Sequence, residues 1–329
     1  MLSFLTRKKD ASIEIKDYVI RYGDIKHRAP VVVNRCEEYY VPEGIIHNGK
    51  IVDMDKFKEI IRTCVQEWGL KGRNIRFIVP DPAVVIRKVD VPAEVPTEEI
   101  QGHLYFELGH KIHLPFENPT LDYALLSEDE ETKEVLLVAS PEEVVDSYHF
   151  QLREEKTKPV VADISPLCHY RLFHHHGAVK EEDRSLLVQM DLQTVTITIF
   201  ENHQPVFMQH VIIPYKEGVC TIESTEEGKL AEDAQFPKED MINALKDMYI
   251  EINRMLRFYE FSFHQGKKTI TKILLTGDHI YFEDICEEVR SNFSLPIEVL
   301  ATSLMKTNSD DTIDRRFHSV LGLAVKEGV

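Results

Sequence analysis

The sequence predicts an α/β fold made of two similar lobes, with a small α+β unit inserted in the first lobe. Three short strands joined by tight turns open each half of the chain, and the two sets of strands begin roughly 170 residues apart. In each half, helices and a later buried strand follow these opening strands. The 329 residues therefore form one duplicated fold rather than two unrelated domains.

In the first half, apolar and polar side chains alternate over residues 11–15, 18–22 and 31–35, which predicts the three strands. An amphipathic helix follows, with Asp53 as its N-cap. Its apolar face is predicted to contain Phe57, Ile60, Ile61, Cys64, Val65 and Trp68. Residues 75–79 then form a buried strand that Pro80 ends.

Residues 81–157 have a different order of strands and helices, which predicts the α+β insert. Its elements are a strand at 84–91, a helix at 97–112, strands at 120–126 and 134–139, and a helix that Pro141 opens.

The second half repeats the opening pattern with strands at 185–190, 194–200 and 205–214. A long helix over 238–264, a strand at 272–276, a helix at 281–293 and a strand at 297–300 are expected to follow. The last helix spans 317–325, and Gly322 in it is expected to allow close packing against a neighbouring element.

The charge limits the classes of partner. The chain has 39 Lys and Arg against 56 Asp and Glu, a net charge of -17, so it lacks the basic face that nucleic-acid binding needs. A broad basic surface for anionic lipid is also not expected. A basic peptide would suit this charge, although the densest acidic stretch is 217–240, with eight acidic residues against two lysines.

No metal or catalytic motif is present. The five cysteines are widely spaced and form no CxxC pair, which predicts free thiols rather than disulfides or a zinc site. Three consecutive histidines, 174–176, cannot all face one metal, and a rim or core role is expected for His103, His110 and His113. No apolar run approaches the ~20 residues of a membrane span, and residues 1–9 are expected to form a frayed, solvated terminus.

Several stretches, taken in their order and spacing, resemble one known family. They are 41–52 (VPEGIIHNGKIV), 87–92 (RKVDVP), 114–123 (LPFENPTLDY), 134–139 (EVLLVA), 158–164 (KPVVADI), 251–259 (EINRMLRFY), 273–277 (ILLTG) and 321–324 (LGLA). The chain resembles PilM, the assembly protein of type IV pili, within the actin/Hsp70 superfamily and near FtsA. The resemblance implies two actin-like lobes, each with a mixed five-stranded sheet, and an FtsA-type insert in the first lobe. It implies a first-lobe core of residues 1–80 plus 158–182, an insert of 81–157, a second-lobe core of 183–215 plus 263–329, and a second-lobe insert of 216–262.

The family resemblance also implies a function. It predicts a cytoplasmic scaffold at the inner face of the cell membrane, in a type IV pilus or a related competence or secretion system. The partner would be the N-terminal cytoplasmic peptide of a PilN-like single-span membrane protein, in a groove between the first subdomain and the insert. Motor ATPases of the pilus are a further expected contact, and a homo-oligomer is left open.

Actin-like proteins hold ATP and Mg²⁺ with two hairpin turns and a glycine-rich turn, and all three depart from the usual pattern here. In the first turn Glu14 keeps a carboxylate, but Lys16 takes the glycine position before Asp17. Loss of a glycine matters because a Cβ hinders the approach of backbone N–H groups to phosphate.

The other two turns also lack residues that the usual nucleotide-binding pattern contains. In the second, Gln189 replaces an acid and Asp191 replaces the glycine before Thr194, and in the third only Gly277 survives, followed by Asp278. These changes predict an eroded nucleotide site, no catalytic residue and no cofactor. The alternative is a working ATP-binding switch in which Lys16 contacts phosphate, and a second alternative is an actin-like filament former.

The peptide groove is assigned to the insert. Tyr105, Phe106 and Phe116 are predicted to line it, with Glu107 and Glu117 pairing with a basic peptide. The alternative for the apolar residues is packing within the insert itself.

Overall fold

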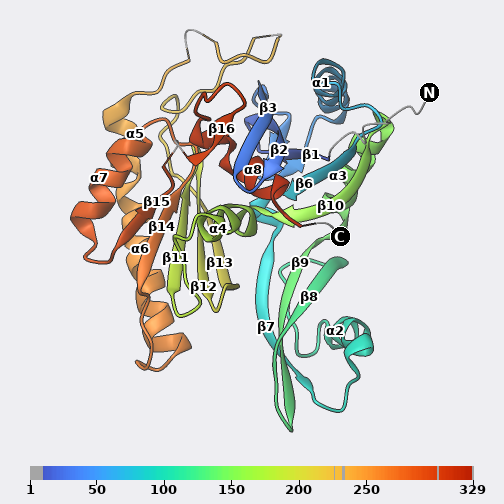
Figure 1. Cartoon of the computed structure of the whole chain (residues 1–329), viewed down its shortest axis with the longest axis vertical. Helices are drawn as coiled ribbons and strands as arrows, with labels where there is room; N and C mark the ends of the chain where they lie inside the picture. The colour runs from blue at the N-terminus through green and yellow to red at the C-terminus, as the bar shows by residue number, and fades with distance from the viewer. Residues whose placement is uncertain (1–9, 226, 232–233, 302–303, 328–329) are drawn as a thin grey trace.

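The computed structural model describes residues 10–225, 227–231, 234–301 and 304–327, so the predicted N-terminal segment 1–9 lies outside the described residues. Two lobes lie side by side, and the insert extends from the first lobe (Figure 1). Within the described ranges, no helix is both long enough and apolar enough to cross a membrane.

A mixed sheet of six strands forms the first lobe. Its strands are β1 (Ala11–Ile15), β2 (Val19–Arg28), β3 (Val31–Tyr40), β6 (Asn74–Val79), β10 (Lys158–Ile164) and β16 (Lys306–Thr307). Their order is β10-β6-β1-β2-β3-β16, with β1 antiparallel to β2 and parallel to β6. The helices α1 (Met54–Glu67) and α3 (Glu142–Glu154) pack on one face of this sheet. A small hairpin of β4 (Ile46–His47) and β5 (Lys50–Ile51) precedes α1.

A mixed sheet of five strands forms the second lobe. Its strands are β11 (Arg184–Met190), β12 (Thr194–Glu201), β13 (Gln204–Ile212), β14 (Lys272–Thr276) and β15 (Ile297–Val299), in the order β13-β12-β11-β14-β15. The meander strands and the two later parallel strands thus keep the same order in both lobes, which confirms the duplication inferred from the sequence.

Helices cover both faces of the second sheet. On one face lie α6 (Lys246–Arg257) and α7 (Phe282–Asn292), while α5 (Lys238–Ala244) precedes α6. On the other face α4 (Ser165–His175) packs between the two sheets, because its Tyr170 and Phe173 share a core with Val33 of the first sheet and Leu187 of the second. Figure 1 shows α4 in this central position.

The insert is a separate three-stranded antiparallel sheet with one helix. The strands β7 (Val85–Pro92), β8 (Pro119–Glu128) and β9 (Thr132–Pro141) have the order β7-β9-β8, and α2 (Ile100–Glu107) packs against them through Ile100 and Leu104. The predicted strands and the first predicted helix of this unit are present, although that helix is shorter than the predicted 97–112. The second helix expected in the insert, the one that Pro141 opens, is α3, and it packs on the first-lobe sheet instead.

The helix α2 ends early for a local reason. Leu108 has an extended backbone, and Gly109 adopts a positive φ of 78°, a conformation that ends a helix and that glycine adopts without steric strain. The predicted helix over 238–264 is also not continuous. It divides at Leu245 into α5 and α6, and residues Phe258–Phe263 continue α6 as a π-helix.

The C-terminal segment returns to the first lobe, which corrects two expectations. The first sheet has six strands rather than five because β16 pairs in parallel with β3. The last helix, α8 (His318–Ala324), was assigned to the second lobe, but it packs on β1, β2 and β6 and against α4. Close packing at Gly322 is confirmed, since a Cβ at this position would overlap the carbonyl of Cys168 in α4.

Candidate functional site

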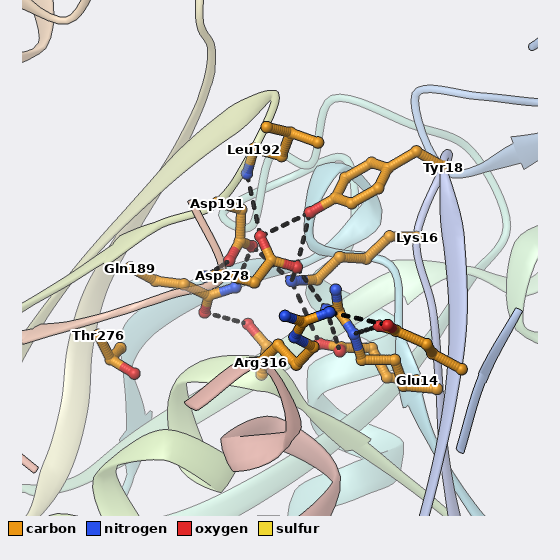
Figure 2. Close-up of polar contacts among 12 residues, drawn as sticks. Glu14, Lys16, Tyr18, Gln189, Asp191, Leu192, Thr276, Asp278 and Arg316 are labelled. Carbon is orange, nitrogen blue, oxygen red and sulfur yellow. Dashed lines mark hydrogen bonds and ion pairs between the residues drawn. The ribbon is translucent and has the colours of Figure 1, made fainter. Parts of the chain in front are cut away.

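Three turns from distant parts of the sequence meet between the two lobes. Lys16 lies in the turn between β1 and β2, Asp191 in the turn between β11 and β12, and Asp278 directly after β14. The first two turns occupy equivalent positions in the duplicated meanders. Figure 2 shows the three side chains pointing toward one another.

The carboxylate of Asp278, in the second lobe, is bound by three side chains of the first lobe. The Tyr18 hydroxyl donates to it at 2.7 Å, Lys16 Nζ lies at 3.2 Å, and Arg21 also donates to it. The backbone N–H of Leu192 adds a fourth hydrogen bond at 3.0 Å. Because the side chain of Asp278 is only 3% exposed, these contacts form a buried link between the lobes.

Lys16 is surrounded by carboxylates. Its Nζ lies 2.9 Å from Asp191, 3.2 Å from Asp278 and 3.6 Å from Glu14. Burial alone would lower the pKa of Lys16, but the charges of Asp191, Asp278 and Glu14 outweigh it and hold this pKa above its usual range. The lysine therefore stays charged, and its charge is already balanced within the protein.

The two aspartates beside Lys16 differ in their affinity for a proton. Burial raises the pKa of Asp191 to about 7, although the charge of Lys16 opposes this. Burial would also raise the pKa of Asp278, but Lys16, Arg21 and the hydrogen bond from Tyr18 hold it well below its usual range. A proton taken up near neutral pH therefore goes to Asp191, and Asp278 stays ionised.

Arg21 extends this cluster toward the C-terminal segment. It lies 3.6 Å from Glu14 and 3.4 Å from Glu38, and Glu38 also accepts a hydrogen bond from Arg316 at 2.8 Å. Arg21 was not among the residues expected at the site. Its position within a predicted strand was the available signal, because an arginine on a central strand needs acidic partners when it is buried, and Arg21 is only 3% exposed.

Gly277 allows the third turn to approach the second. Its φ is +130°, which L side chains rarely adopt, and a Cβ there would overlap the carbonyl of Met190 at the end of β11. The single glycine that this turn retains is therefore the one that the close approach requires.

Backbone N–H groups at these turns already have acceptors inside the protein. The N–H of Lys16 bonds the Val19 carbonyl at 2.9 Å, and that of Asp191 bonds the Thr194 carbonyl at 2.9 Å. The N–H of Asp278 bonds the carboxylate of Asp191 at 3.3 Å. Groups of this kind bind phosphate in glycine-rich turns, but here protein oxygens accept their hydrogen bonds.

A cavity of about 610 Å³ lies beside the cluster, between the lobes. Apolar side chains form part of its wall, among them Ile15, Val79, Pro80, Ile212, Ile213 and Tyr215. Its acidic lining residues are Glu14, Asp17, Glu43, Asp81, Asp191 and Glu217, and its lysines are Lys16 and Lys216. The size is typical of small-molecule sites, and acidic residues outnumber lysines six to two among the lining residues.

Two of these acids are bound at the cavity wall. Asp17 accepts a hydrogen bond from the N–H of Gly49 at 2.9 Å, and Asp81 accepts from Ser165 at 2.7 Å and from Thr196 at 2.9 Å. Asp17 was expected at the site from the sequence, but Asp81 was not. The signal that could have identified Asp81 is an acidic residue just after a buried strand, since such a residue lies at the carboxyl edge of the sheet.

The eight predicted nucleotide-site positions lie around this meeting point. Five of them line the cavity, namely Glu14, Lys16, Asp17, Asp191 and Thr194. Gln189 joins the two lobes, because its amide N–H donates to Asp191 at 2.5 Å and its Oε1 lies 2.9 Å from the Ser165 hydroxyl, whose one proton it shares with the closer Asp81. Gly277 and Asp278 complete the cluster, as described above.

Comparisons with known proteins gave a family match and several similar solved structures. The family model described as "Type IV pilus assembly protein PilM" matches residues 13–321, nearly the whole chain. The chain belongs to the PilM family. No curated protein sequence matches it significantly.

Solved structures show the same fold. A PilM–PilN type IV pilus biogenesis complex is similar with a TM-score of 0.76 and 16% identity, over 97% of this chain and 98% of that one. The cytoplasmic domain of EpsL, an inner-membrane component of the Vibrio cholerae type II secretion system, gives 0.50 and 8%, over 97% and 96%. MreB5 of Spiroplasma citri bound to ADP gives 0.50 and 8%, over 96% and 95%. The fold is therefore that of the actin-like ATPases.

The predicted peptide-binding residues of this PilM-family chain fall into two groups. Tyr105 and Phe106 on α2 are exposed, by 44% and 75%. The helix α2 itself lies on the side of the insert away from the second lobe (Figure 1). Phe116 packs against the core of the insert instead. Glu107 lies 3.3 Å from Lys111, and Glu117 is exposed.

The structure also locates the cysteines and the side chains that could ligate a metal in this PilM-family chain. Among the residues that the structure describes, no group of three or more His, Cys, Asp or Glu side chains is arranged to hold a metal ion. All five cysteines are free thiols, as the sequence predicted.

Proposed function

We propose that this chain is a non-enzymatic scaffold of type IV pilus assembly, or of a related competence or secretion machine, that works without a nucleotide. The observation that carries the proposal is the position of the Asp278 carboxylate. It receives the donors of Tyr18, Lys16, Arg21 and Leu192, so a negatively charged group of the protein itself joins the two lobes.

The same contacts oppose the binding of a triphosphate. A phosphate at the turns would have to displace the protein acceptors from the N–H groups of Lys16, Asp191 and Asp278. It would also approach several carboxylates of like charge, each costing on the order of 1 kcal/mol or more. Three such terms, about 3 kcal/mol together, weaken a micromolar affinity of about 8 kcal/mol by roughly two orders of magnitude.

For the partner, we propose the N-terminal cytoplasmic peptide of a PilN-like membrane protein. The relative with a TM-score of 0.76 was solved as a PilM–PilN complex, and the net charge of -17 suits a basic peptide. The insert would be of the FtsA type, with the peptide between it and the first-lobe core. Tyr105 and Phe106 are the apolar residues of α2 that are free to contact such a peptide.

This partner would also set the location. The scaffold would lie in the cytoplasm at the inner face of the cell membrane, held there through the peptide rather than through a membrane span of its own. From that position it would connect the membrane protein to the motor ATPases of the pilus, either as a monomer or as a homo-oligomer.

The rival function is an ATP-binding switch of the same family. One observation favours it, since Lys16 presents a charged Nζ at a cavity of ligand size. The two functions differ in the effect of Mg-ATP on peptide binding. A fluorescent PilN-like N-terminal peptide should bind with the same affinity with and without Mg-ATP at millimolar concentration, and a tenfold change would favour the switch.

A further inference from the structure

Helix α6 carries an exposed stripe of basic and large apolar side chains that contains no acid. Its members recur at a spacing of three and four residues, so they share one face of α6 and of the π-helix that continues it. They are Lys246, Ile250, Asn253, Arg254, Arg257 and Phe261. All are exposed, Ile250 by 64% and Phe261 by 61%. The stripe thus has the opposite charge to the chain as a whole, whose net charge is -17.

The charges of the α6 stripe are largely unpaired within the protein. Lys246 and Arg257 form no ion pair with any residue that the structure describes, and Arg254 lies 3.5 Å from Glu251 at the edge of the stripe. The opposite face of α6 packs on the second sheet, so the fold does not need the stripe for its core. Arginine and large apolar side chains together are the composition of protein interfaces.

Helix α3 in the first lobe carries a stripe of the complementary kind. Phe150 is 54% exposed there, and the exposed acids Asp146 and Glu143 precede it by four and seven residues. Asp146 has no ion-pair partner among the described residues, and Glu143 lies 3.0 Å from the exposed Lys50. An aromatic side chain beside acids on one exposed helix face would suit a basic and apolar partner surface.

The two stripes match in spacing. On α6 the arginines follow the apolar residue by four and seven residues, and on α3 the acids precede theirs by the same intervals. Antiparallel packing of α3 from one copy on α6 of another therefore brings three pairs together. The pairs are Phe150 with Ile250, Asp146 with Arg254, and Glu143 with Arg257. One pair is apolar and two are oppositely charged, and antiparallel helices also align their dipoles favourably.

We propose that the chain self-associates by docking α6 of one copy on α3 of the next. The two helices lie on opposite sides of the molecule (Figure 1). Because the contact joins two different surfaces, each added copy leaves one α3 and one α6 free, and association continues into a ring or an open chain. One helix pair is a small interface of the weak, transient class. None of these residues lines the cavity between the lobes, so the inference does not depend on the proposed absence of a nucleotide.

The test is sedimentation velocity of the full chain from micromolar to submillimolar concentration. In low salt the weight-average sedimentation coefficient should rise with protein concentration. In high salt it should return toward the value of the monomer, because salt screens exposed ion pairs. A chain that stays monomeric at submillimolar concentration in low salt overturns the inference.

Charge reversal identifies the two faces. Arg254→Glu with Arg257→Glu gives a variant in which both stripes are acidic, and Glu143→Lys with Asp146→Lys gives one in which both are basic. Each variant alone should associate at least tenfold more weakly than the unchanged chain. A mixture of the two should associate again, because every reversed stripe then meets a stripe of opposite charge. Association that survives either reversal, or that mixing does not restore, refutes the pairing.

The control for the reversal on α3 is Asp55→Lys with Glu59→Lys on α1. Both residues are exposed acids one turn apart, and the change in net charge is the same. This control should associate like the unchanged chain. Both reversed variants keep a negative net charge, so general attraction between them does not account for their association on mixing. Circular dichroism verifies that each variant is folded.

A further variant keeps the test valid if a charge reversal fails to fold. Phe150→Ala retains every charge and removes an exposed side chain, and it should weaken association several-fold. Vesicles of phosphatidylglycerol test the other occupant that a basic and apolar stripe suits. If the unchanged chain sediments with these vesicles but does not self-associate, and Arg254→Glu with Arg257→Glu abolishes that binding, the α6 stripe contacts lipid and the inference is wrong.

Discussion

The Tyr18 hydroxyl of the first lobe lies 2.7 Å from the carboxylate of Asp278 in the second lobe, and both are buried. This hydrogen bond crosses from one lobe to the other beside the cavity that lies between them. Hydrogen bonds to charged groups contribute about 1.5–3 kcal/mol each. The lobes are therefore joined by the protein's own side chains.

Asp278→Asn should destabilise the chain by about 3 kcal/mol. The change removes the charge that balances Lys16 and Arg21, and removing one partner of a buried ion pair costs about 3–5 kcal/mol. Urea unfolding followed by circular dichroism measures the effect. Asp55→Asn is the matched control, because Asp55 is 98% exposed and its substitution should stay within about 0.5 kcal/mol. Equal stability of the two variants would contradict the link.

Tyr18→Phe should destabilise the chain by about 2 kcal/mol, because it removes one hydrogen bond to an ionised group. A double-mutant cycle with Asp278→Asn should give a coupling free energy of about 1 kcal/mol or more, since the two groups are in direct contact. Additive effects of the two changes would mean that the contact contributes nothing across the cleft.

Gly277→Ala should abolish the folded state or lower its stability by several kcal/mol. The added Cβ meets the Met190 carbonyl, and a φ of +130° is unfavourable for alanine. Gly102→Ala is the control, because Gly102 lies in α2 with open space around its Cβ position. That change should stabilise the chain by up to about 1 kcal/mol. Thermal unfolding of both variants tests the pair, and similar melting temperatures would refute the argument.

Stability should fall as the pH drops from about 6.5 toward 4. Burial lowers the pKa of His279 to about 4 and that of His318 to about 3, below the value of about 6.5 in the unfolded chain. The unfolded state therefore binds protons that the folded state does not, and each site contributes a slope of about 1.4 kcal/mol per pH unit within this window.

His318→Leu isolates one of these sites. His318 is buried and its Nε2 has no hydrogen-bond partner among the described residues, so an apolar replacement leaves no acceptor unsatisfied there. The slope of unfolding free energy against pH between 6 and 4.5 should fall by about 1.4 kcal/mol per unit. An unchanged slope would mean that this histidine is protonated in the folded state.

Phe106→Ala should weaken binding of a PilN-like peptide without loss of stability. Phe106 is 75% exposed, so its removal leaves no cavity, whereas truncation of a hot-spot residue at an interface costs about 2 kcal/mol or more. Phe116→Ala should instead lower stability by about 2–3 kcal/mol, because Phe116 packs against the insert core. Fluorescence anisotropy and thermal unfolding distinguish the two effects, and full affinity in Phe106→Ala would remove that residue from the site.

Much of the fold could be predicted from periodicity. The alternation over residues 11–15 and 194–200 identified the two meanders, and their identical strand order follows from the duplication. The return of the C-terminal segment was not predictable in this way. Two residues, Lys306–Thr307, form β16, and no alternation can be recognised over so short a stretch. The placement of α8 depends on packing between distant elements, which local propensity does not encode.

The site was predicted in part. The unusual residues at the turns, Lys16, Asp191 and Asp278, were visible as departures from a glycine-rich pattern. Their mutual pairing was not, because the sequence places Lys16 and Asp278 262 residues apart. Asp191 was recognised only as the replacement of a glycine, and in the structure its carboxylate pairs with Lys16. Charge complementarity between distant turns becomes evident only once the fold brings them together.

The central claim is that the side chains around Asp278 take the place of a nucleotide. Isothermal titration of the full chain with Mg-ATP at pH 7.5 tests it most directly. We predict no saturable heat at micromolar concentrations, and no rise in unfolding free energy at millimolar Mg-ATP. A dissociation constant in the low micromolar range, with the stabilisation of about 2.7 kcal/mol expected at a hundredfold excess over that constant, would contradict the account.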